Sequence, residues 1–149
     1  MTEEIAHINK EFWDNFSSIY SDPIQTNNYL HRACSSVEDK IKRDFKLAGL
    51  HDNYSLYAIG GFGKKEMFPS SDIDISIIKK NKDVSKVSQL EAFIASMWDS
   101  GYKIGCSVRS MNELKKIIRE DAKELTTYLT IRPLISDIEE YKESQKMIN

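Results

Sequence analysis

Two aspartates, Asp72 and Asp74, are the residues of this chain whose types and spacing could most directly do chemistry. They are separated by one residue at the start of an apolar segment, and residues i and i+2 of a strand project to the same face. Two carboxylates held side by side repel each other unless a cation lies between them. Their oxygens suit Mg²⁺ or Mn²⁺, and displacement at phosphorus can use such ions. We therefore predict that Asp72 and Asp74 bind the metal and are catalytic.

A glycine-rich turn precedes the aspartates and could hold phosphate. Gly60, Gly61 and Gly63 directly follow a short apolar segment. Glycine lets the backbone approach a ligand closely, and successive N–H groups in such a turn can bind an anion. Lys64 and Ser71, each beside a like residue, add positive charge and hydroxyl donors. Taken singly, the glycines would also fit a tight turn, the lysine a solvated loop and the aspartates a solvated strand edge. In this order, however, the three features favour nucleotide and metal binding.

The elements that must position these residues follow from hydrophobic periodicity and turn signals. Apolar residues at a spacing of three to four predict helices over 3–20, 28–48, 85–98, 111–120, 122–134 and 138–147. Runs of β-branched and aromatic residues predict strands over 55–59, 73–78 and 102–108. Ser110 is the expected N-cap of the helix that follows it. The order predicts an α+β fold with a small mixed sheet of about three to five strands and flanking helices.

Length and composition bound what the chain can be. Its 149 residues and 40% hydrophobic content predict one globular domain, which we divide into helices at 1–50, a sheet-bearing core at 51–137 and a last helix at 138–149. The net charge of −2 gives no overall attraction to nucleic acid. Two cysteines, Cys34 and Cys106, indicate free thiols in a reducing compartment. Without a signal peptide or a membrane-spanning apolar run, we expect a cytoplasmic protein.

The central segment resembles the DNA polymerase β-like nucleotidyltransferase superfamily, whose signature is Gly-Gly or Gly-Ser, a short loop and Asp-x-Asp. Residues 60–74 are more specifically similar to the loop of the bacterial PII uridylyltransferase/uridylyl-removing enzyme family, which typically reads GGYGRGELFPxSDIDLL. Residues 98–110 resemble a second family motif, WDxGLxVGHSVRT, and residues 119–134 its helical continuation. Lys64 stands where the family has arginine, and Cys106 where it has histidine.

The resemblance implies roles for individual residues. Gly60, Gly61 and Ser71 would contact the nucleotide phosphates, Asp72 and Asp74 would bind Mg²⁺, and Arg109 would lie on the strand beside them. Gly63, Lys64 and Arg109 are also expected to help bind the nucleotide. The implied reaction is attack by an acceptor hydroxyl on the α-phosphate of UTP, or of another nucleoside triphosphate, with release of pyrophosphate. In the family the acceptor is a tyrosine of the nitrogen-signalling protein PII.

Two other interpretations stay open. The short length is also typical of a minimal toxin–antitoxin nucleotidyltransferase that modifies a protein or a tRNA. The other interpretation is a non-catalytic regulatory domain that binds nucleotide or a partner. It stays open because residues 102–110 hold no Asp or Glu to serve as a third metal ligand.

Overall fold

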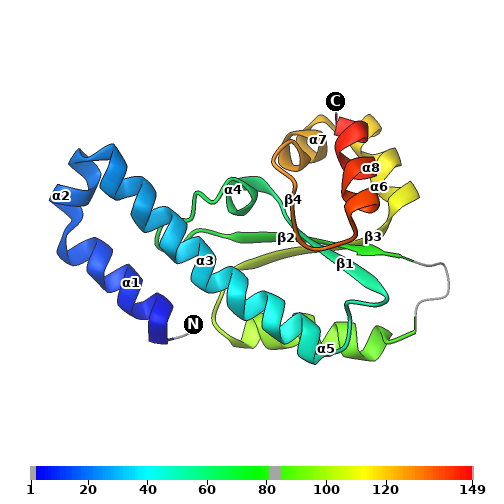
Figure 1. Cartoon of the computed structure of the whole chain (residues 1–149), viewed down its shortest axis with the longest axis horizontal. Helices are drawn as coiled ribbons and strands as arrows, with labels where there is room; N and C mark the ends of the chain where they lie inside the picture. The colour runs from blue at the N-terminus through cyan, green and yellow to red at the C-terminus, as the bar shows by residue number, and fades with distance from the viewer. Residues whose placement is uncertain (1–2, 81–84, 149) are drawn as a thin grey trace.

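A four-stranded mixed sheet lies at the centre of the fold, with helices on both faces (Figure 1). The computed structural model describes residues 3–80 and 85–148. The strands are β1 (Tyr54–Ala58), β2 (Ile73–Lys79), β3 (Ile104–Ser110) and β4 (Arg132–Ile135), in the spatial order β3-β2-β1-β4. β2 and β3 run parallel, whereas β1 is antiparallel to both β2 and β4. The predicted α+β class with a small mixed sheet is confirmed.

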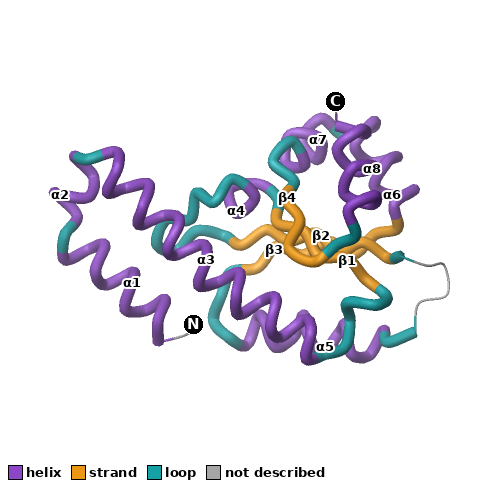
Figure 2. The backbone as a smooth tube through the Cα atoms, viewed as in Figure 1, coloured by secondary structure: helices purple, strands orange, loops and turns teal. Residues whose placement is uncertain are grey.

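The first helices form an arm that packs on one long helix (Figure 2). The helix expected over 3–20 is two helices, α1 (Glu3–Asp14) and α2 (Phe16–Ser21). α3 (Pro23–Leu47) begins five residues earlier than predicted. Asp22 caps it by accepting a hydrogen bond from the backbone N–H of Ile24 at 2.9 Å, and proline is tolerated in the first turn. The segment that ends one helix therefore also starts the next.

The second half of the chain supplies the remaining helices. α4 (Gly60–Gly63) is a single turn, and α5 (Val87–Asp99), α6 (Met111–Glu120), α7 (Ala122–Tyr128) and α8 (Ile138–Ile148) follow. Ser110 caps α6 as predicted, in a capping box with Glu113. In the described part of the chain, no helix is both long enough and apolar enough to cross a bilayer.

The helix predicted over 122–134 is wrong beyond Tyr128. α7 ends at Tyr128, and Arg132–Ile135 form β4 at the edge of the sheet. Pro133 explains the change, because proline removes an N–H group and clashes inside a helix but is tolerated on an edge strand. The edge strand returns the chain to β1, immediately beside the glycine turn.

The two faces of the sheet are buried by different helices. Ile73, Ile75 and Ile77 of β2 belong to the core cluster that includes residues of α3 and α5. Ile78 belongs to the second cluster, with residues of α6 and α7. Because side chains alternate along a strand, Asp74 shares the α6–α7 face with Ile78. The predicted boundaries at residues 50 and 137 stay predictions, although α3 and the sheet share one core cluster.

Candidate active site

The glycine turn connects β1 to the loop that leads into β2. Gly60 has a φ of +59°, in the left-handed region where glycine is favoured. The Gly63 N–H donates to the Ile59 carbonyl at 2.9 Å, which closes the single turn of α4. A Cβ atom on Gly63 would lie 2.2 Å from the carbonyl oxygen of Thr130. Glycine is therefore required at residue 60 by the backbone conformation and at residue 63 by the close approach of Thr130.

Asp74 lies between two glycines, Gly60 in the α4 turn and Gly105 on β3. The parallel pairing of β2 with β3 sets Asp74 opposite Gly105. A Cβ atom on Gly105 would lie 2.4 Å from Oδ1 of Asp74, and one on Gly60 would lie 3.0 Å from Oδ2. The carboxylate therefore occupies a cradle that side chains at either glycine would fill. Gly105 lies in the second family motif, at residues 98–110, but the sequence analysis assigned no role to it.

The aspartate pair has the electrostatics of a cation site. Asp72 is exposed and directly precedes β2, whereas Asp74 is partly buried. Burial, and then the charge of Asp72, raise the pKa of the Asp74 carboxyl above its usual value. A divalent cation bound by both carboxylates would relieve this cost. Within residues 3–80 and 85–148, no group of three or more His, Cys, Asp or Glu side chains is placed so that it could hold a metal ion.

The loop between the turn and Asp72 is folded back onto the turn. The Glu66 N–H donates to the Gly61 carbonyl at 3.0 Å, and the Ser71 N–H donates to the Phe68 carbonyl at the same distance. Met67 is buried and anchors the middle of the loop. Lys64 is exposed and lines a hollow together with Gly60 and Gly61, whereas Ser71 is not among the residues of that hollow.

Arg109 is held by α7. It lies on β3 four residues beyond Gly105, so it shares the face of Asp74 at a position farther along the strand. Its guanidinium pairs with Glu124 at 3.2 Å and donates to the Tyr128 hydroxyl at 3.1 Å. The contact with the nucleotide stays a prediction, and the contacts described here tie β3 to α7.

Cys106 faces away from the aspartates. Its side chain packs against the core cluster on the opposite face of the sheet, and burial raises the pKa of its thiol to about 11. Replacement of the family histidine at this position therefore leaves the face that carries Asp74 unchanged.

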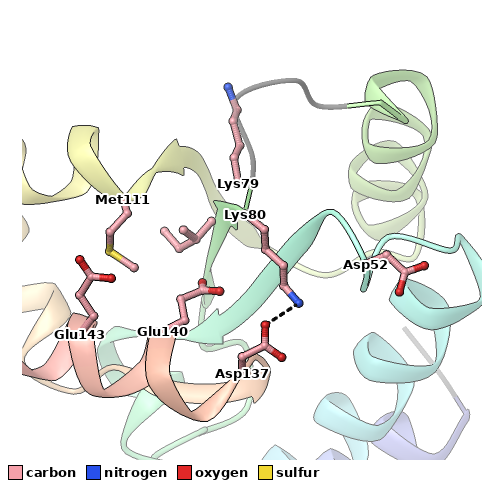
Figure 3. A pocket seen from close by; sticks show the side chains of 8 residues that line it. Asp52, Lys79, Lys80, Met111, Asp137, Glu140 and Glu143 are labelled. Atoms are coloured by element: carbon pink, nitrogen blue, oxygen red, sulfur yellow. Dashed lines mark ion pairs between the residues drawn. The ribbon is translucent and has the colours of Figure 1, made fainter.

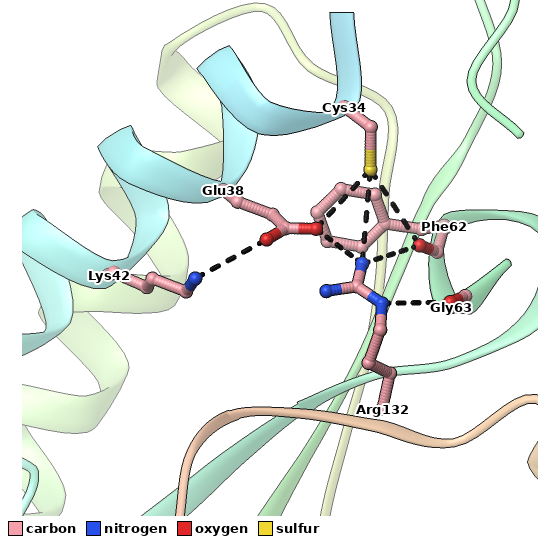
Figure 4. A network of polar contacts seen from close by, with 6 residues as sticks. All are labelled: Cys34, Glu38, Lys42, Phe62, Gly63 and Arg132. Atoms are coloured by element: carbon pink, nitrogen blue, oxygen red, sulfur yellow. Dashed lines mark hydrogen bonds and ion pairs between the residues drawn. The ribbon is translucent and has the colours of Figure 1, made fainter. Parts of the chain in front are cut away.

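An arginine that the sequence analysis missed holds the glycine turn in place (Figure 4). Arg132 of β4 donates through Nε to the Gly63 carbonyl at 2.9 Å and through Nη2 to the Phe62 carbonyl at 3.0 Å. The same guanidinium pairs with Glu38 of α3, which is 4% exposed. Burial alone would raise the pKa of Glu38, but the hydrogen bond and charge of Arg132 bring it below its usual value. The available signal was a carboxylate on the apolar side of α3, next to Val37 and Ile41.

Two hollows lie at opposite ends of β2. One of about 370 Å³, which we call the α4–α7 hollow, is lined by Gly60, Gly61, Lys64, Lys123, Thr126, Thr127 and Thr130. Another, of about 400 Å³, adjoins Lys79 at the far end of β2 (Figure 3). There Lys80 pairs with Asp137 at 3.2 Å, and none of the predicted site residues lines the hollow. The predicted site residues therefore place the candidate active site at the α4–α7 end of the sheet.

Comparison with known proteins identifies relatives of the chain. No family model matches the chain. A bifunctional uridylyltransferase/uridylyl-removing enzyme of Ralstonia nicotianae is 39% identical over 90 residues, 60% of this chain and 10% of the relative. The enzymes of the same name from Acinetobacter baylyi and Burkholderia thailandensis are 35% identical over 127 residues and 30% identical over 107 residues, which cover 83% and 71% of this chain.

The matched region is short compared with these relatives. It spans 10% to 13% of the length of the three curated relatives. The resemblance that the two glycine- and aspartate-bearing motifs indicated is confirmed by these matches. The chain is a homologue of the bifunctional uridylyltransferase/uridylyl-removing enzymes, over a segment that makes up a small part of those proteins.

Proposed function

We propose that this chain is a nucleotidyltransferase domain that transfers UMP, or another nucleoside monophosphate, from a nucleoside triphosphate to a hydroxyl of an acceptor protein such as PII. The observation that carries the proposal is the cradle of Asp74 between Gly60 and Gly105, which sets a partly buried carboxylate beside a glycine turn. The relatives are named uridylyltransferases, which supports the reaction type and makes UTP the favoured donor.

Individual residues would have separate roles in this reaction. Asp72 and Asp74 would hold Mg²⁺ or Mn²⁺, and Gly60, Gly61 and Ser71 would hold the phosphates. When bound, the cation would neutralise triphosphate charge and polarise the α-phosphate. In the reaction the acceptor hydroxyl gives up its proton to solvent and its oxygen forms a bond to the α-phosphorus. The bond from that phosphorus to the bridging oxygen breaks, so that pyrophosphate leaves.

A second candidate is a regulatory domain that binds nucleotide without turnover. One observation favours it: the described residues bring no third carboxylate to Asp72 and Asp74. This candidate predicts Mg²⁺-dependent nucleotide binding with no transfer to any acceptor, so binding and transfer have to be measured separately.

Binding is tested by calorimetric titration of UTP, ATP, GTP and CTP, each with Mg²⁺ and again with EDTA. We expect Mg²⁺-dependent binding, tightest for UTP, and a loss of about tenfold or more in Asp72→Asn and Asp74→Asn. Asp39→Asn is the control, because Asp39 is an exposed carboxylate on α3. Nucleotide binding that requires neither the metal nor the two carboxylates would refute the proposal.

A further inference from the structure

The α4–α7 hollow has two walls that come from distant parts of the chain. Gly60, Gly61 and Lys64 form one wall, and α7 supplies Lys123 and Thr127 to the other. The hollow adjoins the predicted cation site, because Gly60 contributes to the hollow and also lies against the Asp74 carboxylate. A ligand bound to a cation at Asp74 could therefore extend into this space.

Thr130 fixes the two walls relative to each other. Its hydroxyl lies 2.8 Å from the Gly60 carbonyl and 3.2 Å from the Thr127 carbonyl, so one side chain links the glycine turn to the end of α7. The carbonyl of Thr130 also contacts Gly63 so closely that a Cβ there would clash. The hollow is thus a built feature of the fold rather than a gap between independent loops.

The chemistry of the hollow suits a chain of phosphates. Its lining consists of glycines, threonines and two lysines, with no carboxylate and no aromatic side chain on which a base could stack. Lys64 and Lys123 are exposed, and within the described parts of the chain neither forms an ion pair. The threonine hydroxyls on α7 donate to carbonyls of the preceding turn, which leaves Lys123 as the α7 group that brings charge to the hollow.

We propose that α7 forms the second wall of the triphosphate subsite, where Lys123 binds the phosphate chain opposite Lys64. The inference rests on the proposed nucleotidyltransferase function and adds to it a residue outside both the glycine turn and the aspartate pair. The volume of about 370 Å³ is at the small end of the range for ligand pockets, roughly 300 to 1,000 Å³, which suits a compact polyanion. The nucleoside would then lie outside this hollow.

The test measures the affinity of Lys123→Gln for UTP, inorganic tripolyphosphate and UMP, each with Mg²⁺. Lys116→Gln is the matched control, because Lys116 is an exposed lysine on the neighbouring helix α6 and does not line the hollow. We expect Lys123→Gln to weaken UTP and tripolyphosphate by about tenfold and UMP by less than about twofold. Lys116→Gln should match the wild type, and both variants should keep its melting temperature.

The outcomes separate this inference from the function on which it rests. If Lys123→Gln binds UTP as the wild type does while Asp74→Asn loses it, the inference is wrong and the proposed function stands. An equal loss for UMP and UTP would also overturn the inference. Tripolyphosphate binding that depends on Lys123, without binding of any nucleoside triphosphate, would support the polyanion site and refute the proposed function. A wild type that binds neither ligand would refute both.

Discussion

Asp74 and Gly105 face each other across the parallel strands β2 and β3, and the Asp74 carboxylate occupies the space that a side chain at residue 105 would fill. Packing requires glycine at residue 105, because a Cβ atom there would lie too close to the Asp74 carboxylate. The orientation of Asp74 therefore depends on the register of the sheet as well as on the turn that precedes it.

Gly105→Ala is expected to displace the Asp74 carboxylate, because the new Cβ would lie 2.4 Å from Oδ1. The φ of Gly105 lies outside the left-handed region, so the backbone itself accepts alanine. We expect nucleotidyl transfer to fall by about tenfold or more, with a small loss of stability. Ile104→Val, on the opposite face, is the control. Transfer by Gly105→Ala at the wild-type rate would contradict the cradle.

Asp74→Asn is expected to stabilise the metal-free protein. Because the folded state raises the pKa of Asp74, the wild type loses stability as the pH rises from about 4 through that raised pKa, and the cost persists at neutral pH. The variant lacks this cost, so its melting temperature should exceed the wild-type value by roughly 1 to 3 °C at pH 7 and by less at pH 3.5. Saturating Mg²⁺ should raise the melting temperature of the wild type only. A lower melting temperature for the variant at pH 7 would refute this account of the carboxylate.

Arg132→Ala should destabilise the fold strongly. Among the described residues, it leaves buried Glu38 with Lys42, at 3.3 Å, as its remaining ion-pair partner. Loss of one partner of a buried pair costs about 3 to 5 kcal/mol. A double-mutant cycle with Glu38→Gln, followed by urea unfolding, should give a coupling of more than about 1 kcal/mol. Additive losses would show that the pair does not act as a unit.

Tyr128→Phe tests the polar layer under the sheet. The Tyr128 hydroxyl is fully buried and lies 2.7 Å from the Ser76 hydroxyl, with Ser107 and Arg109 as further partners. Its removal should lower the free energy of unfolding by about 1 to 3 kcal/mol, because buried polar groups are left unpaired. Tyr141→Phe, whose hydroxyl accepts a bond from the exposed Gln145, should change it by less than about 0.5 kcal/mol. Equal losses in the two variants would contradict this role.

The local parts of the fold could be predicted from the sequence. The capping box at Ser110 and the strand that carries Asp74 both follow from short-range patterns, and the structure confirms them. β4 could not be recognised from apolar spacing, because four residues are too few to distinguish a strand from the end of a helix. Pro133 was the signal that should have ended the predicted helix.

The long-range parts of the candidate site could not be predicted. The contact of Gly105 with Asp74 depends on the register of two strands that are 31 positions apart in the sequence, and Arg132 meets Glu38 across 94 positions. No local pattern encodes either distance. The charge of Glu38 on an apolar helix face does predict that a buried partner exists, but it does not identify which residue that partner is.

The most direct test of the central claim is transfer of label from UTP, labelled at its α-phosphate, to a PII-type protein in the presence of Mg²⁺. The account predicts that this chain labels a hydroxyl of the acceptor, that EDTA stops the transfer, and that Asp72→Asn and Asp74→Asn each reduce it at least about a hundredfold. Labelling that persists in Asp74→Asn, or Mg²⁺-dependent UTP binding with no transfer at all, would contradict it.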